Sequence, residues 1–125
     1  MAAGREAIKW GIGAIIVGIS SYIMDAYLFH RGTAWPLTNS FFLASLFYSI
    51  FIKRMNPEDP SSRIVLAVSG PIVFGSAISL MLLLKRTYNA DPWFIIFSFS
   101  VTMLPYAVAV LAYTMKRIKA KQDSQ

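Results

Sequence analysis

The residue best suited to take part in chemistry is Asp25, the only charged side chain inside four long apolar stretches of this 125-residue sequence. The stretches cover residues 10–29, 35–52, 64–84 and 93–115. An ionisable group inside such a stretch is costly to bury in a membrane, and it usually marks a functional position. We therefore expect Asp25 either to belong to a ligand or ion site or to lock helices together through a cationic partner.

Three uncharged polar residues, one from each of the other stretches, are expected at the depth of Asp25: Asn39, Ser79 and Ser98. The four side chains would form a polar layer that faces the extracytoplasmic side. A charged rim just outside the stretches would close this layer from above, and its members are His30, Arg31, Lys85 and Arg86. The simpler alternative is that Asp25 pairs with one of these cations, or with a partner subunit, and fixes the packing.

The sequence offers little else for catalysis. It has no cysteine and one histidine, His30, so it predicts no disulfide, thiol chemistry, metal centre or haem site within this chain. There is no phosphate-binding glycine loop, nucleophile elbow or metalloprotease helix motif. We expect no catalytic residue, no cofactor and no enzymatic activity of the chain by itself.

The elements that carry these residues are predicted to be transmembrane helices. Hydrophobic residues make up 56% of the chain and charged residues 14%, whereas a soluble domain has about 25% charged residues. Each apolar stretch has the roughly 20 residues that a helix needs to cross a hydrocarbon core of about 30 Å. The sequence therefore predicts an all-α integral membrane protein with one domain, residues 1–125, of four transmembrane helices.

The distribution of basic residues predicts the orientation. Nine of the twelve lysines and arginines lie before the first stretch, between the second and third, or after the fourth. The positive-inside rule then places both termini in the cytoplasm, and the short links predict an up-down-up-down bundle. This topology accounts for the net charge of +6 without nucleic acid as a partner. The expected location is the cytoplasmic membrane of a prokaryote or an organelle inner membrane.

Turn residues support the same four helices. Asp59-Pro60 and Asp91-Pro92 share one pattern, an aspartate N-cap followed by proline at the first helical position, and they should open the third and fourth helices. Gly32 and Asn89 are suited to the left-handed conformation that commonly ends a helix, so they are predicted to cap the first and third helices.

Two pairs of small residues, each four positions apart, predict close helix packing. They are Ala14-x-x-x-Gly18 in the first stretch and Gly75-x-x-x-Ser79 in the third. Helices in a membrane associate through small side chains that let their backbones approach, so both faces should contact other helices, of this chain or of a partner.

Two prolines lie inside the stretches, Pro71 in the third and Pro105 in the fourth. Each removes a backbone hydrogen bond and is expected to kink its helix. The kinks either give the helices the shape that fits their neighbours or act as hinges in a transporter.

These features favour a small non-catalytic accessory subunit of a larger membrane complex, for example a respiratory, photosynthetic or membrane monooxygenase assembly. Its partners would be membrane lipids and unlike membrane subunits. The alternative is a small homodimeric transporter or channel of four helices. A membrane enzyme acting alone is the weakest interpretation, because one aspartate and one histidine offer little for acid–base chemistry.

Overall fold

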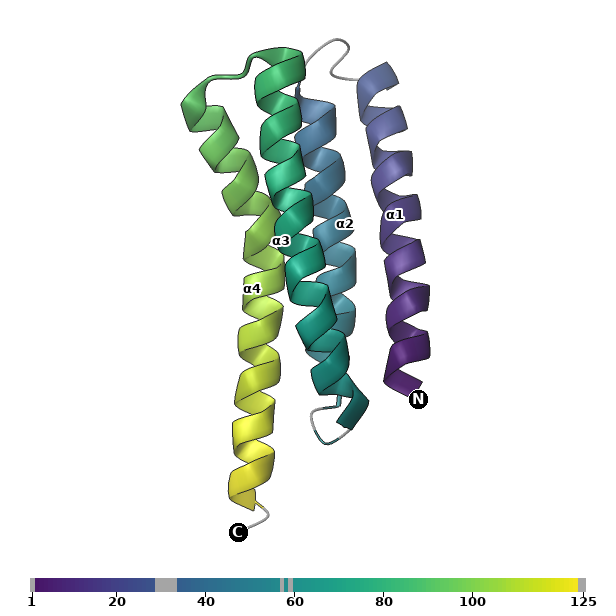
Figure 1. Ribbon diagram of the computed structural model, residues 1–125. Helices are drawn as coiled ribbons and strands as arrows, with labels where there is room; N and C mark the ends of the chain where they lie inside the picture. Colours follow the sequence, from purple (N-terminus) through teal and green to yellow (C-terminus); the bar gives the residue numbers. More distant parts are fainter. Residues whose placement is uncertain (1, 29–33, 57, 59, 124–125) are drawn as a thin grey trace.

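The chain folds into four α-helices that lie side by side (Figure 1). The computed structural model describes residues 2–28, 34–56, 58 and 60–123. The helices are α1 (Ala2–Leu28), α2 (Trp35–Arg54), α3 (Pro60–Tyr88) and α4 (Pro92–Asp123). Each is long and apolar enough to cross a membrane. The prediction of an all-helical fold with four helices long and apolar enough to span a membrane is therefore confirmed. Such helices indicate a multi-pass membrane protein.

The helix starts agree with the turn residues. α3 begins at Pro60 and α4 at Pro92, because the fixed φ of proline suits the first turn and its missing N–H has no partner there. The carbonyl of Asp91 accepts the first hydrogen bonds of α4, from the backbone N–H groups of Phe94 at 3.0 Å and Ile95 at 3.1 Å. Asp59, the other predicted N-cap, lies outside the described residues.

The C-terminus of α3 is capped as predicted. Asn89 has a φ of 50°, the left-handed conformation that asparagine tolerates better than most residues. This reversal lets the N–H of Ala90 donate to the carbonyl of Leu84 at 3.1 Å. Gly32, the predicted cap of the first helix, lies outside the described residues.

Two helices extend about two turns beyond one end of their apolar stretches. α1 starts at Ala2 rather than near residue 10, and α4 continues to Asp123 rather than ending near residue 115. The added turns are rich in alanine, lysine and arginine, which are good helix formers. Figure 1 shows the end of α4 projecting past the other helices at the lower end of the bundle.

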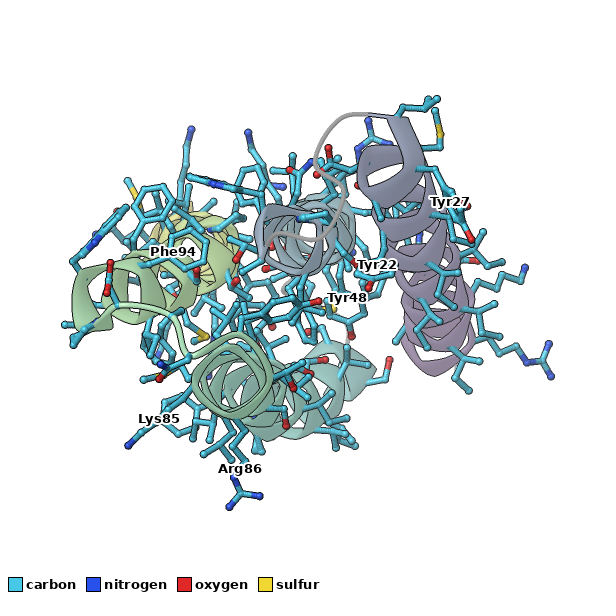
Figure 2. The ribbon with its side chains drawn as sticks, turned by 90° about the horizontal axis from the view of Figure 1, so that it is seen from above. Tyr22, Tyr27, Tyr48, Lys85, Arg86 and Phe94 are labelled. Atoms are coloured by element: carbon cyan, nitrogen blue, oxygen red, sulfur yellow. The ribbon has the colours of Figure 1, made fainter. Side chains whose placement is uncertain are left out.

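The helices do not pack equally against one another. α2 lies against both α1 and α4 along much of its length, whereas α1 and α3 meet over a short region only. Seen from above, α2 stands between α1 and α4, and α3 lies below α2 in the picture (Figure 2). The contacts that α3 makes with α1 and with α2 are thus much sparser than those that α2 makes with α1 and α4.

The core consists of two apolar clusters. The larger one joins α2, α3 and α4 near the lower end of Figure 1 and contains Phe51, Ile52, Met55, Val65, Tyr106, Ala109 and Tyr113. The smaller one joins α3 and α4 near the upper end and contains Leu80, Leu84 and Phe94. Buried hydroxyl groups occur on α2, α3 and α4.

Candidate functional site

Asp25 lies near the end of α1, and only 8% of its surface is exposed. It continues a stripe of small residues that recurs every three or four positions: Gly4, Ala7, Gly11, Ala14, Gly18 and Ser21. Residues at this spacing share one face of a helix. Ala14, Gly18 and Asp25 are all buried, so this face of α1 is turned toward the bundle.

The predicted polar layer is only partly buried. Asp25 and Ser98 are buried, whereas Asn39 and Ser79 are exposed on the outer surface of the chain. The α2 residue that contacts Ser98 is instead Thr38, whose hydroxyl lies 3.0 Å from that of Ser98. Successive residues on a helix are about 100° apart. One position along α2 therefore separates a buried threonine from an exposed asparagine.

The predicted outer rim does not close over Asp25 in the described residues. Lys85 and Arg86 are exposed, and Figure 2 shows both pointing outward from α3. Their neighbour Leu84 is fully buried, which fixes the rotation of this part of α3 and directs the two cations away from the core. His30 and Arg31, the other members of the rim, lie outside the described residues.

Buried hydroxyls hold the helices together along the bundle. Besides Thr38 and Ser98, the hydroxyl of Ser45 donates to the backbone carbonyl of Thr102 at 2.6 Å and so joins α2 to α4. Two hydroxyl pairs join the other helices: Tyr48 with Ser69 at 2.5 Å and Ser62 with Tyr113 at 2.6 Å. In hydrocarbon a hydroxyl has no water as an alternative partner, so such bonds favour one arrangement of the helices.

Apart from Ser98, these residues were not predicted from the sequence, although their spacing is visible there. On α2 the hydroxyls recur at positions 38, 45 and 49, and on α4 they recur at positions 98 and 102. Both sets lie at intervals of four or seven residues, which place them on one face of a helix. A search for hydroxyl periodicity inside the apolar stretches would have predicted the α2–α4 interface.

The interface between α1 and α2 is a close approach of backbones. A Cβ added at Gly18 would lie 3.3 Å from both the Cβ of Ala44 and the Oγ of Ser40, and the Ser40 hydroxyl donates to the Gly18 carbonyl at 2.7 Å. At Gly13 an added Cβ would meet the Phe47 ring at 2.7 Å. At Gly18, the face predicted to meet another helix therefore lies against α2.

The second pair of small residues, Gly75 and Ser79, has different surroundings. Gly75 and Ser79 are exposed, and a Cβ added at Gly75 would meet no atom within 4 Å. α3 directs Ala77 and Leu80 into the core, so the Gly75–Ser79 face points away from it. Within this chain the face has no helix packed against it among the described residues.

Both internal prolines lie inside continuous helices. α3 runs through Pro71 and α4 through Pro105. Pro105 has no N–H to donate to the carbonyl of Val101, and Figure 1 shows α4 changing direction between its tilted upper part and its straight lower part. The tilt moves the start of α4 away from the bundle axis.

A lateral groove runs between α1 and α3, with α2 as its floor. Its volume is about 720 Å³, within the range of about 300–1,000 Å³ that is usual for small-molecule sites. The small-residue stripe of α1, from Gly4 to Gly18, forms one wall, and residues from Ile64 to Ser76 of α3 form the other. The hydroxyl-bearing floor includes Tyr48, which points into the space between α1 and α3 (Figure 2).

The groove has no charged lining residue among the positions that the structure describes. Within those same positions, no three histidine, cysteine, aspartate or glutamate side chains come together as metal ligands would. The chemistry available here is therefore apolar contact and hydrogen bonding by hydroxyl groups. Searches against protein families, curated proteins and solved structures found no match for this chain.

Proposed function

We propose that this chain is a small non-catalytic accessory subunit of a larger complex in a prokaryotic cytoplasmic membrane or an organelle inner membrane. The observation that carries the proposal is the open face of α3 around Gly75 and Ser79. In a membrane, lipid tails are as apolar as leucine, so a small-residue face gains most from the close approach of another helix. The partner would be a transmembrane helix of an unlike subunit.

The internal hydroxyls support the same role. Those of Ser40, Ser45, Tyr48 and Ser62 each bond to another helix of the bundle, which makes the chain a rigid body that can brace a neighbour. A subunit that supplies shape and lipid contact needs no reactive group of its own. In this account Asp25 locks the packing at the outer end of α1.

A measurement of the intact assembly tests the proposal. The native protein would be extracted in a mild detergent and its mass determined by native mass spectrometry. A stable particle with unlike subunits is expected, and Gly75→Leu should release the chain from it. A homodimer as the only assembly would contradict the accessory role.

The alternative is a homodimeric transporter or channel, and the buried carboxyl of Asp25 favours it. Asp25→Asn in proteoliposomes separates the two functions, because the amide keeps the size of the side chain and removes its charge. Loss of ion or substrate flux with assembly intact would favour the transporter. If the variant fails to assemble and the native protein itself shows no flux, Asp25 has a packing role.

The proposed topology places both termini and the link between α2 and α3 in the cytoplasm. Because the sequence has no cysteine, single cysteines report their side of the membrane directly. Asn56→Cys and Gln122→Cys should react with an impermeant maleimide only from the cytoplasmic side, and Thr87→Cys only from the outer side. Reaction of the first two from opposite sides would contradict the topology.

A further inference from the structure

We propose that the outer seam between α2 and α4, at the end of the bundle where α2 ends, binds the headgroup of an anionic phospholipid through Lys53, Lys116 and Lys119. This seam is the lipid-facing edge of the α2–α4 interface. The inference does not depend on the accessory role. It rests on the convergence of three cations from two helices, on their depth, and on the apolar surface directly beside them.

Two helices bring the three lysines to one level. The ammonium group of Lys116 donates to the backbone carbonyl of Lys53 at 2.6 Å, so this part of α4 lies against the last turn of α2. Lys119 follows Lys116 by three residues, and this spacing makes their side chains neighbours on the surface of α4. All three side chains are exposed. The seam therefore carries three positive charges within about one turn of each helix.

These charges are not neutralised within the described chain. None of the three ammonium groups forms an ion pair with a described acidic side chain. Of the acidic side chains that the structure describes at this end, Glu6 pairs with Lys9 at 3.8 Å, and Glu58 belongs to the link between α2 and α3. A lysine has three N–H donors, so Lys116 keeps two after its bond to the carbonyl. The seam can thus donate hydrogen bonds to an anion as well as attract it.

The depth of the lysines matches that of lipid phosphates. The apolar stretch of α4, residues 93–115, is about 34 Å long at 1.5 Å per residue and so spans a hydrocarbon core of about 30 Å. Lys116 directly follows this stretch, and Lys53 directly follows the apolar stretch of α2. Because the headgroup region begins where the hydrocarbon ends, the ammonium groups face the layer that contains the phosphates.

Apolar side chains continue the seam into the hydrocarbon. On α2, Leu46 and Ile50 precede Lys53 by seven and three residues, and on α4, Met115 precedes Lys119 by four. These intervals place the apolar side chains on the same helix faces as the lysines. Leu46, Ile50 and Met115 are all exposed. Acyl chains that lie along this surface would leave their phosphate beside the lysines.

The charge of the seam selects the class of lipid. Lysine acts as a point charge toward phosphate, and basic clusters at the ends of transmembrane helices attract anionic headgroups. In phosphatidylglycerol the phosphate carries the only charge. In phosphatidylcholine a trimethylammonium group neutralises the headgroup and would be repelled by the three lysines. The seam should therefore prefer phosphatidylglycerol.

Photolabelling of the full chain in vesicles of phosphatidylcholine at about 0.15 M salt tests the proposal. The probes are phosphatidylglycerol and phosphatidylcholine with the same diazirine in one acyl chain. Phosphatidylglycerol should label the α2 and α4 peptides of the seam more strongly than phosphatidylcholine. Lys119→Gln should lower the ratio of the two labelling yields about fivefold, the usual contribution of one basic residue. Lys53→Gln should lower it as well, and Lys119→Arg, which keeps the charge, should preserve it.

Arg117→Gln is the matched control. It removes one charge from the same turn of α4, but at about 100° per residue Arg117 lies on nearly the opposite side of the helix from Lys119. The labelling ratio at the seam should then change by less than about twofold, because salt screens the more distant charge. Helix content and elution volume report the folding of each variant.

Four results would overturn the proposal. Equal loss in Lys119→Gln and Arg117→Gln would mean that the lysines act only through the total surface charge. Equal labelling by the two lipids would mean that the seam does not recognise the headgroup. Displacement of phosphatidylglycerol by excess glycerophosphate would indicate a site for a soluble anion. In native membranes, a photoreactive group at Met115 that reacts with a protein instead of lipid would show that a partner covers the seam.

Discussion

The Ala14–Gly18 face of α1 and the Gly75–Ser79 face of α3 have the same small-residue spacing and opposite surroundings. Gly18 is in contact with α2, where an added Cβ would lie 3.3 Å from Ser40 and Ala44. At Gly75 the same addition meets no atom within 4 Å. The spacing of small residues thus indicates where a helix can approach closely, and the surrounding helices decide whether one of this chain does so.

A second comparison concerns two threonines. The hydroxyl of Thr38 is paired with Ser98 across the α2–α4 interface, while that of Thr102 has no partner among the described residues. Both side chains are almost completely buried. The first hydroxyl therefore joins two helices, and the second is buried without such a bond. Three substitutions test these contrasts.

The largest effect is expected for Gly18→Leu. Leucine at this position forces α1 away from α2, and overpacking of this kind costs about 1–3 kcal/mol. The measurement is the free energy of unfolding of the detergent-solubilised chain in a titration with sodium dodecyl sulfate. Gly75→Leu is the matched control, because both changes gain the same helix propensity, and it should stay within about 0.5 kcal/mol of the native value. Equal destabilisation by both variants would remove the contrast between the faces.

A moderate effect is expected for Thr38→Val. Interhelical hydrogen bonds in membranes contribute about 0.6 kcal/mol on average and up to about 1.7 kcal/mol, and the valine keeps the shape of the threonine. The double-mutant cycle with Ser98→Ala should show that the two losses are not additive, because either change breaks the same bond. Additive losses would mean that the two hydroxyls act separately.

The smallest effect is expected for Thr102→Val in the same titration. The substitution removes a hydroxyl that makes no hydrogen bond, so the free energy of unfolding should change by less than about 0.5 kcal/mol or should rise. A loss as large as that of Thr38→Val would show that the Thr102 hydroxyl has a structural partner.

Much of the architecture could be predicted from local chemistry. The four apolar stretches define four helices, proline marks the first residue of α3 and α4, and Asn89 ends α3 in the left-handed conformation. Each of these features depends on one residue or on a short run of residues. The extension of α1 and α4 past their apolar stretches was not predicted, because hydropathy marks where a helix leaves the hydrocarbon and not where it ends.

The candidate site could be predicted only in part. Asp25 and Ser98 were identified and are buried, but Asn39 and Ser79 were assigned to the same layer and are exposed. Depth along a helix follows from residue number, whereas the direction of a side chain depends on the rotation of the helix. For Asn39, that rotation is set by contacts of Thr38 and Ser45 with α4, which involve residues about 60 positions away.

The sequence by itself determined that the chain has four segments long and apolar enough to cross a membrane, because the transfer of about 20 apolar residues into hydrocarbon depends on composition alone. Only the tertiary structure decided which side of each helix is buried, that Gly18 contacts α2, and that a groove remains beside Thr102. The physical reason is that lipid and protein interior are equally apolar. A membrane helix therefore does not need the polar outer face that reveals the orientation of a helix in water.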